Sequence, residues 1–201
     1  MIRPRLPELP PWRQRMPGAP WPLGEHGSAA HHEAGHLVTA RLVGFAPGNA
    51  VVGQENGGRA TIGITGKTPD PIDESALEQP MPPVESYADL FGETFEETWP
   101  RISGGRSRLE SAFDYTTVLL AGRQAELIHA GIEIKEPCVF VLSDSDHDIA
   151  IAILARVEEL AALGWLQKRA RELLTAHWPE VEQQADLIQQ AANTTEAAAI
   201  A

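Results

Sequence analysis

The chain has 201 residues, carries a formal net charge of −12 and contains one cysteine. This length suffices to bury the core of one main domain, and the negative charge argues against nucleic acid as a partner, because phosphate recognition requires a basic surface. The single cysteine, Cys138, excludes a disulfide within the chain and fits a reducing compartment. No segment approaches the roughly 20 apolar residues of a membrane-spanning helix, and the N-terminus lacks a secretory apolar run, so we expect a cytoplasmic protein without membrane insertion.

The first part of the chain is predicted to form an arm, a helix and a hairpin. Residues 1–26 are dense in proline, which favours an extended arm over a packed element. From Ser28, a residue type that favours helix N-termini, apolar residues recur at helical spacing until Gly44, which predicts the first helix. Residues 50–65, AVVGQENGGRATIGIT, contain two short β-runs around the turn sequence ENGG, which predicts a β-hairpin.

The segment 66–104 is acidic, and its first half is rich in proline. Between Lys67 and Pro100, nine acidic residues stand against one lysine, so this stretch carries −8 of the total charge of −12. A stretch with so much charge buries little apolar surface of its own. We therefore expect an acidic, partly mobile insertion at the surface of the domain.

Four further helices are predicted in the second half of the chain. Ser107 and Glu110 form a capping-box pattern at the start of a long helix, and the segment at about 147–163 is apolar around most of its circumference, which predicts a buried helix. The last two helices are expected at about 165–176 and 179–192, followed by a frayed tail at 193–201. The predicted fold class is therefore a mainly α domain over residues 27–192, with a small β-hairpin beside the first helix.

The stretch His32-Glu33-Ala34-Gly35-His36 matches the pattern HExxH. On a helix, positions i and i+4 lie one turn apart on the same face, so His32 and His36 can bind one ion. Neutral imidazoles suit Zn²⁺, and two of them with one carboxylate leave a position for water. Glu33 is then placed to take a proton from the activated water. Gly35 lies mid-helix, where glycine is unfavourable, which predicts close packing against a neighbouring element.

The remaining members of the site are less well defined by spacing. His31 lies about 100° from His32 around the helix and has no histidine one turn on, so we expect it at the surface or behind the ligands. A third ligand has to come from elsewhere in the chain. Spacing alone leaves five candidates open, which are Glu126, Asp144, Asp146, His147 and Asp148.

Three patches of the chain resemble the peptidase domain of the FtsH family of ATP-dependent zinc metalloproteases. HHEAGHLVTARLVG resembles that family's HEAGH helix, YTTVLLAGRQAELIHAG resembles its second helix with a run of the type LLGGRAAE, and SDSDHDIAIAILARV resembles the loop and helix that carry a ligand aspartate. The sequence AHWPEVEQQADLI fits the family's closing helix more weakly. Together these patches cover most of residues 28–192, in the order that the family has.

The resemblance implies a complete zinc site. Its ligands would be His32, His36 and Asp148, because the family's ligand aspartate is followed by an apolar residue, as Asp148 is. Glu33 corresponds to the family's catalytic glutamate. Glu126 would lie on a supporting helix, where it would either orient a ligand from behind or serve as an ordinary ion-pairing acid. His147, beside Asp148, could approach the metal, but a surface position at the N-terminus of a helix is favoured for it.

The chain also departs from the family. It contains no GxxxxGK[ST] phosphate loop and no membrane span, and Ala121 stands where the family has the first glycine of its GGR run. We therefore expect an isolated peptidase domain that acts on peptides or unfolded chains, or that works with an ATPase partner in trans. The oligomeric state stays open, because the family's hexamer depends on the ATPase module.

The sequence thus predicts a zinc-dependent metalloendopeptidase with Glu33 as general base and then general acid. The alternative is a catalytically weak or inactive zinc-binding regulatory module of the same fold, which the missing ATPase module favours. A third reading is a zinc hydrolase that acts on a non-peptide amide. In the peptidase reading, the hairpin at 50–65 would offer an edge strand to an extended peptide.

Overall fold

The computed structural model describes residues 26–52, 58–63, 95–96, 99–100, 103–132 and 145–200. These residues are mainly helical, as the sequence predicts. The elements are α1 (His26–Leu42), β1 (Ala46–Val52), β2 (Gly58–Gly63), α3 (Arg108–His129), α4 (Ser145–Arg156), a 3₁₀ turn (Leu160–Ala162), α5 (Leu163–Ala176) and α6 (Trp178–Ile200). The predicted arm except its last residue, the turn of the hairpin, most of the acidic segment, Cys138 and Asp144 lie outside the described residues.

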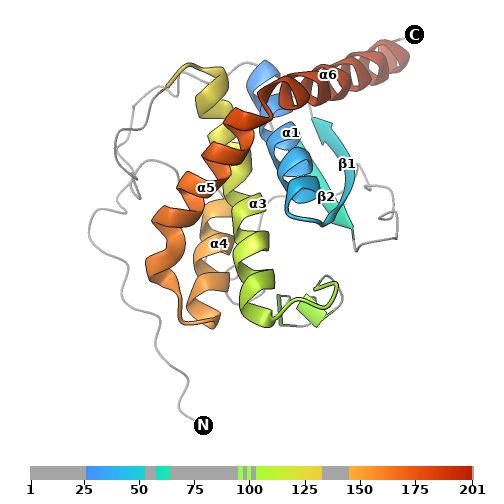
Figure 1. Cartoon of the computed structure of the whole chain (residues 1–201). Helices are drawn as coiled ribbons and strands as arrows, with labels where there is room; N and C mark the ends of the chain where they lie inside the picture. The colour runs from blue at the N-terminus through green and yellow to red at the C-terminus, as the bar shows by residue number, and fades with distance from the viewer. Residues whose placement is uncertain are drawn as a thin grey trace, which may run out of the picture.

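Helix α1 lies at the centre of the described fold. The two strands lie on one side of α1 and helix α3 on the other, while α6 returns across α1 (Figure 1). Helix α3 in turn contacts α4 and α5. Because it has neighbours on several sides, α1 is buried around most of its circumference, and residues 33–40 are all buried.

Strands β1 and β2 pair antiparallel in a two-stranded sheet that lies against α1. The pairing runs from Ala46 opposite Gly63 to Val52 opposite Gly58, with a shift of register between Pro47 and Ala50. Proline has no backbone N–H to donate, which fits an irregularity at this point of the ladder. The first strand begins four residues before the predicted start of the hairpin at residue 50.

Helices α1 and α3 approach each other closely at Gly35. A Cβ atom at Gly35 would lie 2.8 Å from the backbone oxygen of Ala121 and 2.8 Å from the Cβ of Ala125. Small residues on both helices therefore allow this contact, and the packing need predicted for Gly35 is confirmed. Helix α1 ends before Gly44, whose φ of +83° suits glycine.

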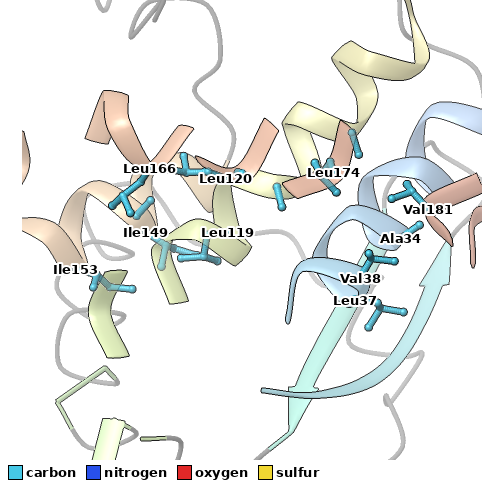
Figure 2. Close-up of a cluster of buried hydrophobic side chains, with 14 of the residues drawn as sticks. Ala34, Leu37, Val38, Leu119, Leu120, Ile149, Ile153, Leu166, Leu174 and Val181 are labelled. Carbon is cyan, nitrogen blue, oxygen red and sulfur yellow. The ribbon is translucent and has the colours of Figure 1, made fainter. Parts of the chain in front are cut away.

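One cluster of buried side chains joins helices α1, α3, α4, α5 and α6. Figure 2 shows this core, to which α1 contributes Ala34, Leu37 and Val38, and α6 contributes Val181. The other labelled members come from α3, α4 and α5, and these are Leu119, Leu120, Ile149, Ile153, Leu166 and Leu174. The core therefore fixes the relative positions of α1, α3 and α4, which carry the candidate site.

The predicted capping box at the start of α3 is confirmed. The Ser107 side chain accepts a hydrogen bond from the backbone N–H of Glu110, and the Glu110 carboxylate accepts one from the backbone N–H of Ser107 at 2.8 Å. The helix ends at His129, and Gly131 follows with a φ of +67°.

Several boundaries differ from those predicted. Helix α4 ends at Arg156 rather than at about 163, because the chain turns at Glu158, which has a φ of +62°. Helix α6 extends to Ile200, beyond the predicted end at about 192. Its last turns are rich in alanine, which has the highest helix propensity.

Part of the segment predicted as an acidic surface insertion packs against the domain. Phe95 is buried in the core cluster and Trp99 packs beside it. Glu96 forms an ion pair with Arg108 near the start of α3. Among the described residues, no helix has the length and apolar character needed to cross a membrane.

Candidate metal centre

The two histidines of the HExxH pattern lie on α1 with their imidazole rings side by side. The ring centroids of His32 and His36 are 4.7 Å apart, as expected for positions one helical turn apart. In each ring an acceptor on α3 engages Nδ1. The Nδ1 of His36 donates to the backbone oxygen of Val118 at 2.7 Å, and the Nδ1 of His32 donates to Glu126 Oε1 at 3.0 Å. Both Nε2 atoms therefore remain as the ligand atoms.

Asp146, from the first turn of α4, meets both histidines. Its Oδ2 lies 3.0 Å from Nε2 of His32 and 3.2 Å from Nε2 of His36. One ligand atom from each of the three residues lies within 4.8 Å of the other two. Donors that share one tetrahedral Zn²⁺ at about 2.0 to 2.1 Å lie roughly 3.3 Å apart. The two distances to Asp146 therefore match the spacing of donors within a metal centre.

The third member of the cluster is the carboxylate of Asp146, where the resemblance implied Asp148. The two aspartates are two positions apart on α4, which corresponds to a rotation of about 200° around the helix axis, so both cannot face the histidines. The resemblance favoured Asp148 because an apolar residue, Ile149, follows it and an alanine stands four positions later. Asp146 also has an alanine at that spacing, the fully buried Ala150, but the residue that follows it is His147. The sequence pattern therefore points to Asp148, whereas the packing of α4 against α3 brings Asp146 to the histidines.

The charges of the three donors depend strongly on one another. Burial disfavours the charged form of His32, but the hydrogen bonds to Asp146 and Glu126 outweigh it, so the pKa of His32 lies well above its ordinary value. The pKa of His36 is raised in the same way, against burial, by the charge of Asp146. Burial would raise the pKa of Asp146, yet His36 and His32 hold it far below its usual range. An ion at this place would replace the protons that hold the cluster together.

Glu33 is next to His32 and almost completely buried, with 3% of its surface exposed. Within the described part of the chain, its Oε2 is buried and accepts no hydrogen bond. Burial raises the pKa of Glu33, and the positive charges of His36 and His32 offset only part of this effect. A buried carboxylate with a raised pKa and a free oxygen is suited to accept a proton.

Glu126 lies behind His32, on the side opposite Asp146. Besides accepting from His32 it forms an ion pair with Arg123, one turn earlier on α3. Burial opposes its ionisation, but the contacts with His32 and Arg123 leave the pKa of Glu126 below its ordinary value. The carboxylate is therefore charged, and it fixes the orientation of the His32 ring, as expected for a supporting residue.

The remaining predicted residues occupy other surroundings. His31 stacks on His129 of α3 at 3.7 Å between ring centroids and on Trp178 of α6 at 5.8 Å. It therefore belongs to the junction of three helices. His147 is buried, with 7% of its surface exposed, and does not occupy the surface position favoured for it.

Two contributors to the site were not predicted as such. The backbone oxygen of Val118 orients His36, and a backbone acceptor leaves no signal in the sequence. Gly122 lies against both imidazoles, because a Cβ there would be 2.5 Å from Nε2 of His32 and 2.5 Å from Nε2 of His36. The glycine in the sequence AGRQAE is the one feature from which the contact of Gly122 with the two imidazoles could have been predicted.

The donor set could hold a divalent transition metal. Two imidazole nitrogens and one carboxylate oxygen form a common ligand set of catalytic zinc, with a fourth position for water. Both imidazoles have an oxygen acceptor at the other ring nitrogen, which is the usual environment of a ligand histidine. Comparison of the chain with family models, with curated proteins and with solved structures finds no match. The geometry of the site is therefore the basis for its proposed chemistry.

Proposed function

We propose that the protein is a zinc-dependent metallopeptidase whose centre is held by His32, His36 and Asp146. The observation that carries the proposal is the convergence of these three side chains beside the buried Glu33. A Zn²⁺ ion bound by this set would lower the pKa of a water molecule and polarise a carbonyl group. The residue types and their order along the chain also resemble those of the FtsH peptidase domain, which supports a peptide as substrate.

The residues of the chain have separate tasks in hydrolysis. Glu33 accepts a proton from the attacking water as the new C–O bond forms at the peptide carbonyl. It then delivers that proton to the leaving nitrogen as the C–N bond breaks, so that a neutral amine departs. Burial favours the first step, since the raised pKa of Glu33 makes it a stronger base than an exposed glutamate.

The small sheet beside α1 favours a substrate that binds as an extended chain. In the part of the chain that the structure describes, each of the two strands pairs on one side only, and an extended peptide can add to the other side of a strand through backbone hydrogen bonds. We propose that β2 offers this edge. Proline substitutions at residues 60–63 should then slow peptide turnover while zinc content stays the same, and unchanged turnover would exclude β2 as the binding edge.

Substitution of Glu33 by glutamine tests the proposed reaction. The amide cannot accept the proton, so we expect peptide cleavage by Glu33→Gln to fall by about 10²-fold or more while zinc per chain is unchanged. The measurement is turnover of a fluorogenic peptide library at saturating zinc. The exposed acid Asp186 on α6 offers a control, since Asp186→Asn should cleave at the wild-type rate.

The same experiment separates the alternative function. Zinc bound by wild type and by Glu33→Gln with no cleavage by either would favour a zinc-binding regulatory module. Equal cleavage by both proteins would contradict the role of Glu33.

A further inference from the structure

Gly122 occupies an unusual place in the middle of α3. A Cβ atom there would lie 2.5 Å from Nε2 of both His32 and His36, and 2.7 Å from Cδ2 of His32. Carbon and nitrogen atoms that are not bonded to each other prefer separations of roughly 3.5 to 4 Å. Any side chain at position 122 therefore overlaps the two imidazoles where they now lie.

The other glycine in the contact of α1 with α3 has a different environment. A Cβ at Gly35 would meet the backbone oxygen of Ala121 and the Cβ of Ala125, each at 2.8 Å. Those atoms are fixed by the helix itself, so relief requires the helices to move apart. At Gly122 the neighbouring atoms are the ends of two side chains, which can rotate away without movement of the backbone.

We propose that Gly122 is a positioning residue of the metal centre. By lacking a side chain, it lets both imidazoles lie directly on α3 with their Nε2 atoms directed at Asp146 Oδ2, at 3.0 and 3.2 Å. The backbone of α3 thereby forms one wall of the centre, and the same helix supplies the acceptors for both Nδ1 atoms, Val118 and Glu126. This inference rests on the proposed metal centre.

The proposal predicts that metal binding and folding respond separately to a methyl group at position 122. In Gly122→Ala, the imidazoles have to turn, and the three donors no longer converge on one point. Metal affinity should fall by at least about tenfold, which is the effect commonly seen when the residues that orient ligands are altered. Alanine is also the better helix former, so α3 itself is not weakened.

The test is a titration of the metal-free protein with Co²⁺, followed by its visible absorbance, and with Zn²⁺ in competition with a chromogenic chelator. Wild type, Gly122→Ala and Gly35→Ala are compared, and each metal-free protein is melted by circular dichroism. We expect Gly122→Ala to melt within a few degrees of wild type and to bind both ions at least about tenfold more weakly. Gly35→Ala should show the larger loss of thermal stability.

Three outcomes would overturn the inference, and they can be told apart. Wild-type affinity in Gly122→Ala would exclude a positioning role while leaving the metal centre intact. No binding of Co²⁺ or Zn²⁺ by wild type would remove the proposed centre, and this inference with it. If Gly122→Ala does not fold, the change is repeated with both histidines replaced by alanine. If the protein without the two histidines folds, the added methyl group clashes with the imidazoles, as the inference requires. If it still does not fold, the methyl group clashes with other atoms, and the inference is wrong.

Discussion

Both imidazoles of the candidate centre are oriented by other groups of the protein. Val118 and Glu126 hold the Nδ1 atoms, and the two Nε2 atoms point to a shared carboxylate oxygen. Both acceptors belong to α3, whereas the histidines belong to α1. The geometry of the ligands therefore depends on how these two helices pack.

Loss of the Glu126 carboxylate should weaken the centre without removing it. In Glu126→Ala, the His32 ring loses the acceptor at Nδ1, so zinc affinity should fall by about 10- to 100-fold. Affinity is measured by competition with a chelator, and Glu172→Ala, an exposed acid on α5, should bind as wild type does. An unchanged affinity in Glu126→Ala would show that the contact with His32 has no supporting role.

The sequence was sufficient for some residues of the site and not for others. His32, Glu33 and His36 follow from helical periodicity, which is a local property of the chain. The choice between Asp146 and Asp148 depends on how α4 rotates against α3, and that rotation is decided by core side chains far apart in sequence. The local pattern favoured Asp148, which an apolar residue follows, so the place of Asp146 beside the histidines became visible only in the tertiary structure. The role of Gly122 was likewise hidden, because it depends on what another helix places against it.

At the scale of the elements, the signals that the sequence carries differ in strength. The capping box of α3 involves two residues three positions apart, so Ser107 and Glu110 predict it directly. The end of α4 depends on a turn at Glu158 with positive φ, a conformation that glutamate rarely adopts, and no local residue announces it. The sequence also gives no clear signal for the end of α6, because asparagine and threonine disfavour a helix only slightly.

The capping box predicts a dependence of stability on pH. Hydrogen bonds from the Ser107 side chain and backbone hold the pKa of Glu110 below its ordinary value. A carboxylate whose pKa is lower in the folded state stabilises the fold above its unfolded pKa of about 4.3, and this contribution is lost as pH falls through the folded pKa.

Glu110→Ala should therefore be less stable than wild type at pH 7, and the difference should shrink as the pH approaches 3. Urea unfolding of both proteins between pH 7 and pH 3 measures this difference in the free energy of unfolding. The intrinsic helix propensities of the two residues add an offset to the difference, and the test depends on how the difference changes with pH. A difference that is constant with pH would show that the ionised carboxylate contributes nothing.

At the scale of the whole molecule, the candidate centre links parts of the chain that are more than a hundred residues apart. His32 and His36 lie on α1 and Asp146 on α4, and these helices meet through α3 in one core (Figure 1). An ion held by all three donors would bind the folded chain and not the unfolded one. Metal binding is therefore expected to add to the stability of the whole domain.

Thermal unfolding tests this linkage. A ligand present at about 100 times its Kd contributes roughly 2.7 kcal/mol. For a chain of this size that corresponds to a rise in the unfolding midpoint of about 5 to 10 °C. Zinc should produce this rise in the metal-free wild type and a chelator should reverse it. The protein with both His32→Ala and His36→Ala should not respond, and a wild-type midpoint that zinc does not move would contradict the linkage.

The central claim is that His32, His36 and Asp146 together hold a metal ion. The most direct measurement is zinc per chain, by elemental analysis after dialysis against metal-free buffer, for wild type, Asp146→Ala and Asp148→Ala. We expect about one zinc per chain in wild type and in Asp148→Ala, and a large loss in Asp146→Ala, because Asp146 is the acid that, among the described residues, forms the cluster with both histidines. Full zinc content in Asp146→Ala, or its loss in Asp148→Ala alone, would contradict this account of the centre.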